Sequence, residues 1–366
     1  MPTDKDNPPA APRGMSIAAL RTLRLALGTS ASLWFSQAVG WPLSFIAPVF
    51  TMFLLALPTP APSFKMGASL VVVLTGSMYA GALLLLPALT YQPLLGLLLV
   101  VLSLFWSFYF TATGGSQLIG SFATIGIALT TAVGSVNIDA VLILANGLAL
   151  GALVGIVFVW LAHLAMPDRR AMDAPPPGAM PPPPAANLSP GQARWSALRA
   201  LLVVFPVAFW FLLSPASAAN MPVMLKVAAM GQQAATEDAR RAARSLVVST
   251  VVGGIGAIIG WQALSIAPTL TLYTLVIALG GLLAGPRIFK GRGMHADAET
   301  WSYAYLTMIV ILAPAVMDSM GGGPAGAKFL DRLIMFAGTA VYAVIAIYVT
   351  DAFRPHRRRR AEPGRG

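Results

Sequence analysis

The sequence predicts an all-α polytopic membrane protein with about twelve transmembrane helices, arranged as two parallel six-helix repeats. Three observations predict this class. First, the 366 residues are 57% hydrophobic and only 10% charged, whereas about a quarter of the residues of a soluble domain are charged. Second, apolar runs of roughly 18 or more residues recur along the whole chain, as is typical of membrane spans. Third, the second half repeats the plan of the first.

The first repeat is expected over residues 17–165. Residues 1–16 contain neither an apolar h-region nor a small-residue cleavage site, so they predict a disordered cytoplasmic tail and an uncleaved first span. Proline and glycine mark the joints between the spans that follow, for example at Pro42 and Pro93. The six expected spans are 17–38, 42–57, 66–88, 93–111, 117–135 and 139–164.

A proline-rich segment separates the two repeats. Residues 166–195 include "DAPPPGAMPPPPAANLSPG", which favours polyproline II, so they predict a semi-rigid cytoplasmic linker, with a proline-motif docking site as the alternative. The second repeat is expected over residues 196–352, followed by a basic cytoplasmic tail over 353–366. Its six expected spans are 196–213, 221–236, 241–263, 267–285, 299–317 and 329–350.

The repeat is visible in short matching segments. "ALRTLRLALG" (19–28) opens the first half and "ALRALLVVFP" (197–206) opens the second. "ASLVVVLTG" (68–76) recurs as "RSLVVSTVVGG" (244–254). The same order at a similar offset predicts parallel repeats that are related by an axis along the membrane normal.

The distribution of lysine and arginine predicts the orientation. With an even number of spans in each half, most of the basic residues fall on one side of the membrane. Because cytoplasmic loops are enriched in lysine and arginine, this side and both termini are expected in the cytoplasm. This bias requires the segment 221–236 to cross, and it accounts for the net charge of +11 without a nucleic-acid partner. The expected cytoplasmic basic residues are Arg13, Lys65, Arg169, Arg170, Arg194, Arg240, Arg241, Arg244, Arg287, Lys290, Arg292 and the cluster 354–360; the opposite side keeps Lys328 and Arg332.

Lys226 is the main candidate for a functional residue. On a helix, Lys226, Met230, Gln233 and Glu237 share one face. A charge deep in a bilayer costs about 2.5–3.5 kcal/mol on insertion scales, so it persists where it faces a hydrated cavity, a partner charge or a ligand. Lys226 and Gln233 are therefore candidates for binding an organic anion. The alternative is a lysine that snorkels to the interface or forms a static ion pair.

Two further groups are candidates of the same kind. Arg21 and Arg24 lie on a helical stripe of the first span and are candidate substrate-binding residues, although membrane anchoring explains them equally well. Glu237 and Asp331 are the candidate proton-coupling residues, because acidic side chains at span ends can relay protons. Helix capping is the alternative for Asp331.

Pairs of small residues predict close helix crossings. These glycines are spaced four residues apart. Gly147, Gly151 and Gly155 form one run, and Gly256 with Gly260 and Gly281 with Gly285 form two pairs.

The sequence contains no constellation typical of an enzyme. It has no cysteine, no phosphate-binding GxxxxGK[ST] loop, no HExxH and no GxSxG motif. Its three histidines lie far apart and predict no metal site. We therefore expect neither catalysis nor a cofactor.

The first half resembles the fusaric acid resistance and aromatic acid exporter superfamily of bacterial inner-membrane proteins. The resemblance rests on "ALRTLRLALGTSASLWF" as the first span and on "WPLSFIAPVFTMFLLALPTPAPSFK" leading into a glycine-bearing third span. Trp41 and Pro42, then "LPTP" (57–60), Lys65 and Gly76 match the pattern of that superfamily. The chain lacks large cytoplasmic domains and is similar to the compact branch of the superfamily.

The resemblance and the cationic stripe together lead to one expectation. We expect a secondary efflux transporter of the bacterial inner membrane that exports aromatic or other hydrophobic organic anions, driven by protons. The resemblance also implies a periplasmic membrane-fusion adaptor as a partner, and homo-oligomers are compatible with it. The alternatives are a passive anion channel, as in the plant members of the wider group, and a non-transporting membrane scaffold for an adaptor.

Overall fold

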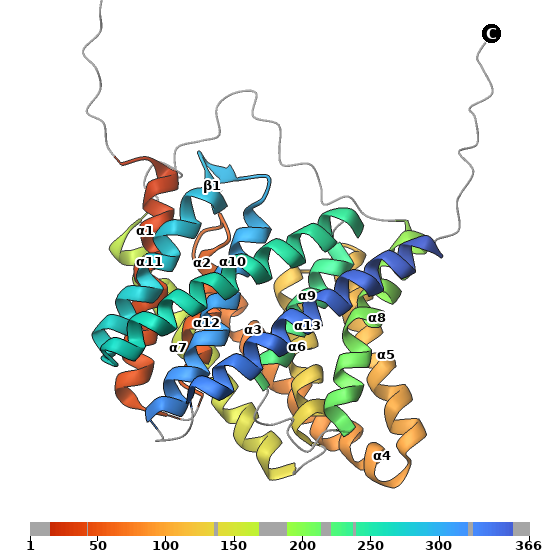
Figure 1. The fold of residues 1–366 in the computed structure, drawn as a ribbon. Coiled ribbons are helices and arrows are strands. Elements are labelled where there is room, and N and C mark those ends of the chain that lie inside the picture. The colour runs from red at the N-terminus through yellow and green to blue at the C-terminus, as the bar shows by residue number, and fades with distance from the viewer. Residues whose placement is uncertain are drawn as a thin grey trace, which may run out of the picture.

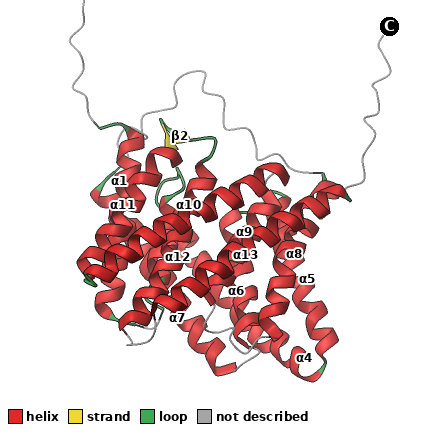
Figure 2. Cartoon of the chain, viewed as in Figure 1, coloured by secondary structure: helices red, strands yellow, loops and turns green. Residues whose placement is uncertain are grey.

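The computed structural model describes residues 15–41, 43–134, 138–167, 189–213, 221–236, 239–320 and 325–353. These residues are almost entirely helical (Figure 2). The elements are α1 (Ile17–Val39), α2 (Ile46–Leu55), α3 (Phe64–Ala80), the π-helical turn η1 (Gly81–Leu85), α4 (Leu86–Tyr91), α5 (Pro93–Ala112), α6 (Gln117–Gly134), α7 (Ile138–Ala165), α8 (Pro190–Leu213), α9 (Met221–Thr236), α10 (Ala239–Ile266), α11 (Leu270–Ile288), β1 (Phe289–Lys290), β2 (Gly293–Met294), α12 (Ala298–Met320) and α13 (Ala325–Ala352).

The all-α membrane class predicted from the sequence is confirmed. Among the described residues, seven helical stretches are long and apolar enough to cross a membrane, as judged by their length and composition. Each expected span coincides with a helix, and the third runs continuously from α3 through η1 into α4. The seven stretches are 64–91, 93–112, 141–165, 190–213, 240–266, 270–288 and 326–352.

Four helices, α2, α6, α9 and α12, form the interior of the bundle. Every side chain described from Val223 to Ala235 in α9 and from Tyr303 to Ala315 in α12 is buried. Helix α2 is only ten residues long and almost wholly buried. None of the four meets the length and hydropathy of a span among the described residues, and a helix shielded by protein needs neither.

The remaining helices surround this interior. In Figure 1, α1 and α11 stand together at the left, α5 and α8 stand together at the right, and α10 and α13 cross the front at a slant. The hairpin of β1 and β2, which pairs Phe289 with Met294, lies at the same end as the start of α1. Helix α4 lies at the opposite end (Figure 1).

The helix expected to open the second half begins earlier than the sequence indicated. Helix α8 starts at Pro190, inside the segment 166–195 that was expected to be linker. Ser189 and Gln192 explain the difference, because the Gln192 side chain accepts a hydrogen bond from the Ser189 backbone N–H at 3.2 Å. This arrangement is one half of a capping box, and proline is well suited to the first helical position. Most of the linker and both expected tails lie outside the described residues.

Two other helix starts differ by four residues from those expected. Helix α2 begins at Ile46 and not at 42, and Leu43 adopts a φ of 65° in the turn before it. Helix α13 begins at Ala325 and not at 329. Both differences lie at helix starts, where local sequence patterns fix boundaries least.

Candidate functional site

Lys226 lies at the centre of the protein. It belongs to α9, which packs against α5, α6, α8, α10, α12 and α13. The side chain is 1% exposed. Its Nζ donates a hydrogen bond of 2.6 Å to Thr307 Oγ1 and lies 5.6 Å from the centroid of the Tyr303 ring. Among the described residues, no carboxylate forms an ion pair with Lys226.

This geometry does not agree with a lysine that snorkels to the headgroups. Thr307 lies near the middle of α12 (Ala298–Met320), and Tyr303 lies one turn closer to the start of that helix. The ammonium group therefore points across the bundle toward α12. Its burial leaves the charge among protein groups and away from the lipid interface.

Two glutamines of α9 tie this helix to both halves of the bundle. Gln232 Nε2 donates to Thr124 Oγ1 of α6 at 2.7 Å, and Thr124 in turn contacts Ser107 of α5 at 2.8 Å. Gln233 Nε2 donates to Ser245 Oγ of α10. The structure thus places Gln233 at a helix contact near the end of α9. The sequence analysis missed the role of Gln232, although adjacent glutamines on a helix point in different directions.

A buried arginine fixes the same end of α9. Arg199 of α8 is 4% exposed and donates from Nε and Nη2 to the carbonyl oxygen of Ala234, at 2.9 and 2.6 Å. Carbonyl groups in the last turn of a helix lack partners within the helix, and a cation suits the negative end of the helix dipole. The "ALR" that opens both halves of the sequence was the signal for this residue.

Arg21 and Arg24 are held by backbone carbonyls at one end of the bundle. Arg21 Nη1 donates to the carbonyl oxygen of Arg292 at 2.8 Å, and Arg24 Nη1 donates to that of Met166 at 3.3 Å. Both are buried in α1, which packs against α2, α7 and α11. The structure therefore does not bring them together with Lys226, and their contacts suit the anchoring interpretation.

The serines of the first span also serve helix packing. Thr51 Oγ1 of α2 donates to Ser32 Oγ of α1 at 3.0 Å, and Ser36 Oγ donates to the Ser32 carbonyl oxygen at 2.6 Å.

Of the two candidate proton-coupling residues, the structure describes only Asp331. Asp331 is exposed near the start of α13. Glu237 lies outside the described residues.

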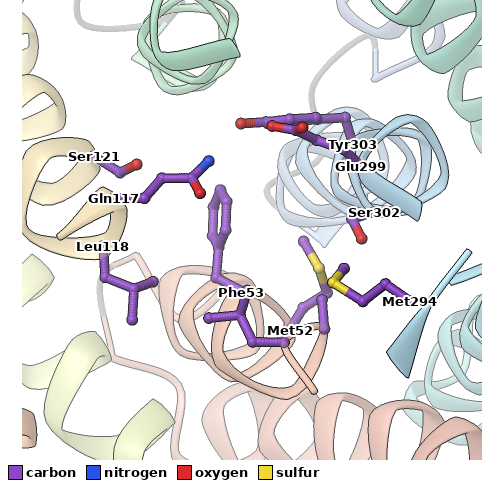
Figure 3. A pocket seen from close by; sticks show the side chains of 11 residues that line it. Met52, Phe53, Gln117, Leu118, Ser121, Met294, Glu299, Ser302 and Tyr303 are labelled. Atoms are coloured by element: carbon purple, nitrogen blue, oxygen red, sulfur yellow. The ribbon is translucent and has the colours of Figure 1, made fainter. Parts of the chain in front are cut away.

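A cavity of about 200 Å³ opens between the end of α2 and the starts of α6 and α12. In Figure 3, Tyr303 and Glu299 extend from α12 into this space, and the Gln117 amide points into it from α6. Tyr303 therefore contacts the cavity and also Lys226. The apolar lining includes Met52, Phe53, Leu57, Leu118 and Met294, and the polar lining includes Gln117, Ser121, Glu299, Ser302 and Tyr303.

Glu299 is a lining residue that the sequence analysis missed. Its Oε1 atom is buried and has no hydrogen-bond partner among the described residues. A glutamate in the first turn of a helix is usually a capping residue, so the sequence alone gave no sign of the cavity. Among the described residues, no three or more histidine, aspartate or glutamate side chains come close enough to hold a metal ion.

Comparison with family models gives a match in the first half of the chain. Residues 21–162 match a family of membrane proteins described as "Protein of unknown function (DUF2955)". The match covers most of the first expected repeat. No curated protein and no solved structure matches the chain. The resemblance to the aromatic acid exporter superfamily stays a prediction.

Proposed function

We propose that this protein is a transporter in the bacterial cytoplasmic membrane that exports aromatic or other hydrophobic organic anions, with coupling to protons. The observation that carries the proposal is Lys226, a buried ammonium group that no described carboxylate neutralises. A periplasmic adaptor remains an expectation from the resemblance.

The surroundings of Lys226 suit an anion. A buried cation without a counter-charge is expensive, by several kcal/mol after relaxation. Lys226 contacts Thr307 and Tyr303, and both are neutral groups. An ammonium group has three donors, and the hydrogen bond to Thr307 uses one of them. A carboxylate that approached from the Tyr303 side would supply both the missing charge and an acceptor.

The cavity suits the body of such a ligand. Small-molecule sites are concave, mostly apolar, and carry a few polar groups that orient the ligand. The cavity has this character, since Phe53, Met52 and Leu118 form its apolar wall and Gln117 and Ser121 add amide and hydroxyl groups. Its volume of about 200 Å³ accommodates one small aromatic acid. Tyr303 lines this cavity and also contacts Lys226, so a change in its rotamer would open the cavity to the ammonium group.

The helix contacts favour two repeats that meet at this site. If α1, α2, α5 and α6 correspond to α8, α9, α11 and α12, then the contact of α1 with α11 corresponds to that of α8 with α5. Likewise, the contact of α2 with α12 corresponds to that of α9 with α6, and all four contacts are present.

Close contacts within each half follow the same correspondence. A Cβ atom on Gly126 would meet Ser77, and one on Gly253 would meet the Ala304 carbonyl oxygen. Ser77 and Gly253 lie at the same offset in the matching segments of α3 and α10, and Gly126 and Ala304 lie on the corresponding helices α6 and α12. We infer twelve crossing helices in two parallel repeats, with the substrate path at the repeat interface, where transporters of this kind bind their substrates.

Growth of bacteria on a toxic aromatic carboxylate tests the proposal. Cells that express the wild-type chain should grow at higher concentrations of the acid than cells with an empty vector. Lys226→Ala should abolish the protection and Lys226→Arg should weaken it. Lys65→Ala, which removes an exposed lysine, should protect as well as wild type. Full protection by both Lys226 variants would exclude the assigned role.

A buried lysine would also attract anions in a passive channel. Electrical recording distinguishes such a channel from a transporter. A channel would give single-channel anion currents in a planar bilayer that need no proton gradient. A transporter would give none. A scaffold would show neither current nor flux, and its polar interior residues would tolerate alanine.

A further inference from the structure

The cavity has one feature that the proposed function does not use, namely an acidic side chain in its wall. Glu299 contributes from the first turn of α12, and its buried Oε1 has no hydrogen-bond partner among the described residues. Figure 3 shows its carboxyl group beside Tyr303, facing the same space as Gln117. The other acidic side chains that the structure describes are Asp139, Asp297, Asp331 and Asp351, and none of them lines the cavity.

The basic groups around Glu299 are engaged elsewhere. From α9, Lys226 lies behind Tyr303 and bonds to Thr307. From α11, Arg287 stacks over the Trp301 ring at 4.2 Å. From α10, Arg241 donates to the Ala296 carbonyl oxygen at 2.7 Å.

The other elements that pack against α12 add no charge at the cavity. The lining residues from α2 and α6 are uncharged, and α13 contributes none. On the chain just before α12, His295 and Asp297 are exposed. No described base forms an ion pair with Glu299.

An anion and an ionised Glu299 would repel each other in so small a space. At a separation of about 6 Å and an effective dielectric constant of about 20, the repulsion weakens binding by roughly a hundredfold, and partial solvation reduces this to about tenfold. A protonated Glu299 removes the repulsion. It also becomes a hydroxyl donor that can bond to the anion.

We propose that Glu299 couples proton binding to anion binding, so that an organic anion occupies the cavity together with a proton on this carboxyl group. This inference rests on the proposed function. The proton moves from water to a Glu299 carboxylate oxygen as the anion enters, and it returns to water when the anion leaves. By linkage, the proton tightens anion binding as much as the anion tightens proton binding.

Binding of benzoate to the purified full-length chain in detergent, followed by calorimetry, tests this coupling. Benzoate stays ionised between about pH 5 and about pH 8, so its own charge is the same at both ends of this range. Wild type should bind benzoate about tenfold more tightly at the lower pH. Glu299→Gln should bind equally tightly at both. Glu299→Asp should restore the dependence on pH, and Asp139→Asn, which changes an exposed acid outside the cavity lining, should leave it intact.

Each contrary result has a distinct meaning. If Glu299→Gln keeps the wild-type dependence on pH, another group such as Lys226 carries it and the coupling is wrong, while the proposed function stands. Tighter binding at higher pH would also overturn the coupling, because it means that the proton and the anion compete for the cavity. If benzoate does not bind to any folded variant but benzylammonium binds to wild type, the proposed anion function fails, and the coupling fails with it.

Discussion

At the scale of single residues, Lys226 shows both the reach and the limit of sequence analysis. The helical period placed Lys226 and Gln233 on one polar face, and it correctly indicated that the lysine needs a special environment. It could not reveal Thr307, Tyr303 or the cavity, because these lie on other helices and meet α9 only through tertiary packing. Glu299 was missed for the same reason, since a glutamate near a helix start has an ordinary local explanation.

Removing the hydroxyl partner of Lys226 should destabilise the protein. Thr307→Val keeps the size of the side chain but leaves the ammonium group without its 2.6 Å hydrogen bond. We expect the free energy of unfolding to fall by about 1–3 kcal/mol, the cost of an unsatisfied buried polar group. Thermal unfolding in detergent measures the change. Thr113→Val, at an exposed site, should have little effect, and equal stabilities for the two variants would contradict the described contact.

Replacing the lysine itself should separate stability from function. Lys226→Met removes a buried charge and keeps an unbranched side chain, and such replacements are often neutral or stabilising. We therefore expect an unchanged or higher unfolding temperature together with lost transport. A marked loss of stability would instead identify Lys226 as a structural residue.

At the scale of elements, the glycine pairs were predicted from the sequence and are confirmed as close helix contacts. A Cβ atom on Gly155 would meet α2, and Cβ atoms on Gly281 and Gly285 would meet α1. The spacing revealed that helices approach each other there, but not which ones. The contact of α11 with α1 joins two helices that are distant in the sequence, so no local pattern could identify it.

A methyl group at this contact should weaken the packing of α11 on α1. A Cβ atom on Gly281 would lie 2.7 Å from the Ala26 Cα atom, which is backbone and cannot move away alone. We expect Gly281→Ala to lower the free energy of unfolding by about 1–3 kcal/mol. Gly76→Ala is the matched control, because no atom lies within 4 Å of its added Cβ, and it should cause no loss. Equal effects of the two substitutions would disprove the close approach.

At the scale of the whole molecule, the sequence predicted every helical segment that the structure describes. It did not predict which of these helices lie in the interior of the bundle and which surround it. The hydrophobic runs located all twelve segments because burial in lipid and burial in protein both require apolar side chains. For that same reason, they could not distinguish α2, α6, α9 and α12 in the interior from the helices that surround them. Helix starts such as Pro190 depended on capping contacts that the apolar pattern does not record.

The orientation of the bundle gives a direct test of the even number of spans in each half. The chain has no cysteine, so single cysteines can be introduced at exposed positions and labelled with a charged, impermeant thiol reagent. Cysteines at Ser63 and Lys290 should react only from the cytoplasmic side, and cysteines at Gln92 and Lys328 only from the other. Reaction of Ser63→Cys and Lys290→Cys from opposite sides would mean an odd number of crossings between them.

The central claim is that Lys226 faces the path of an organic anion, and its most direct test is flux through the purified protein. Proteoliposomes loaded with radiolabelled benzoate should lose it through the wild-type chain and through Lys65→Ala. Lys226→Met, folded and equally well inserted, should release benzoate no faster than protein-free liposomes, and Lys226→Arg should fall between. Release by Lys226→Met at the wild-type rate would contradict the account.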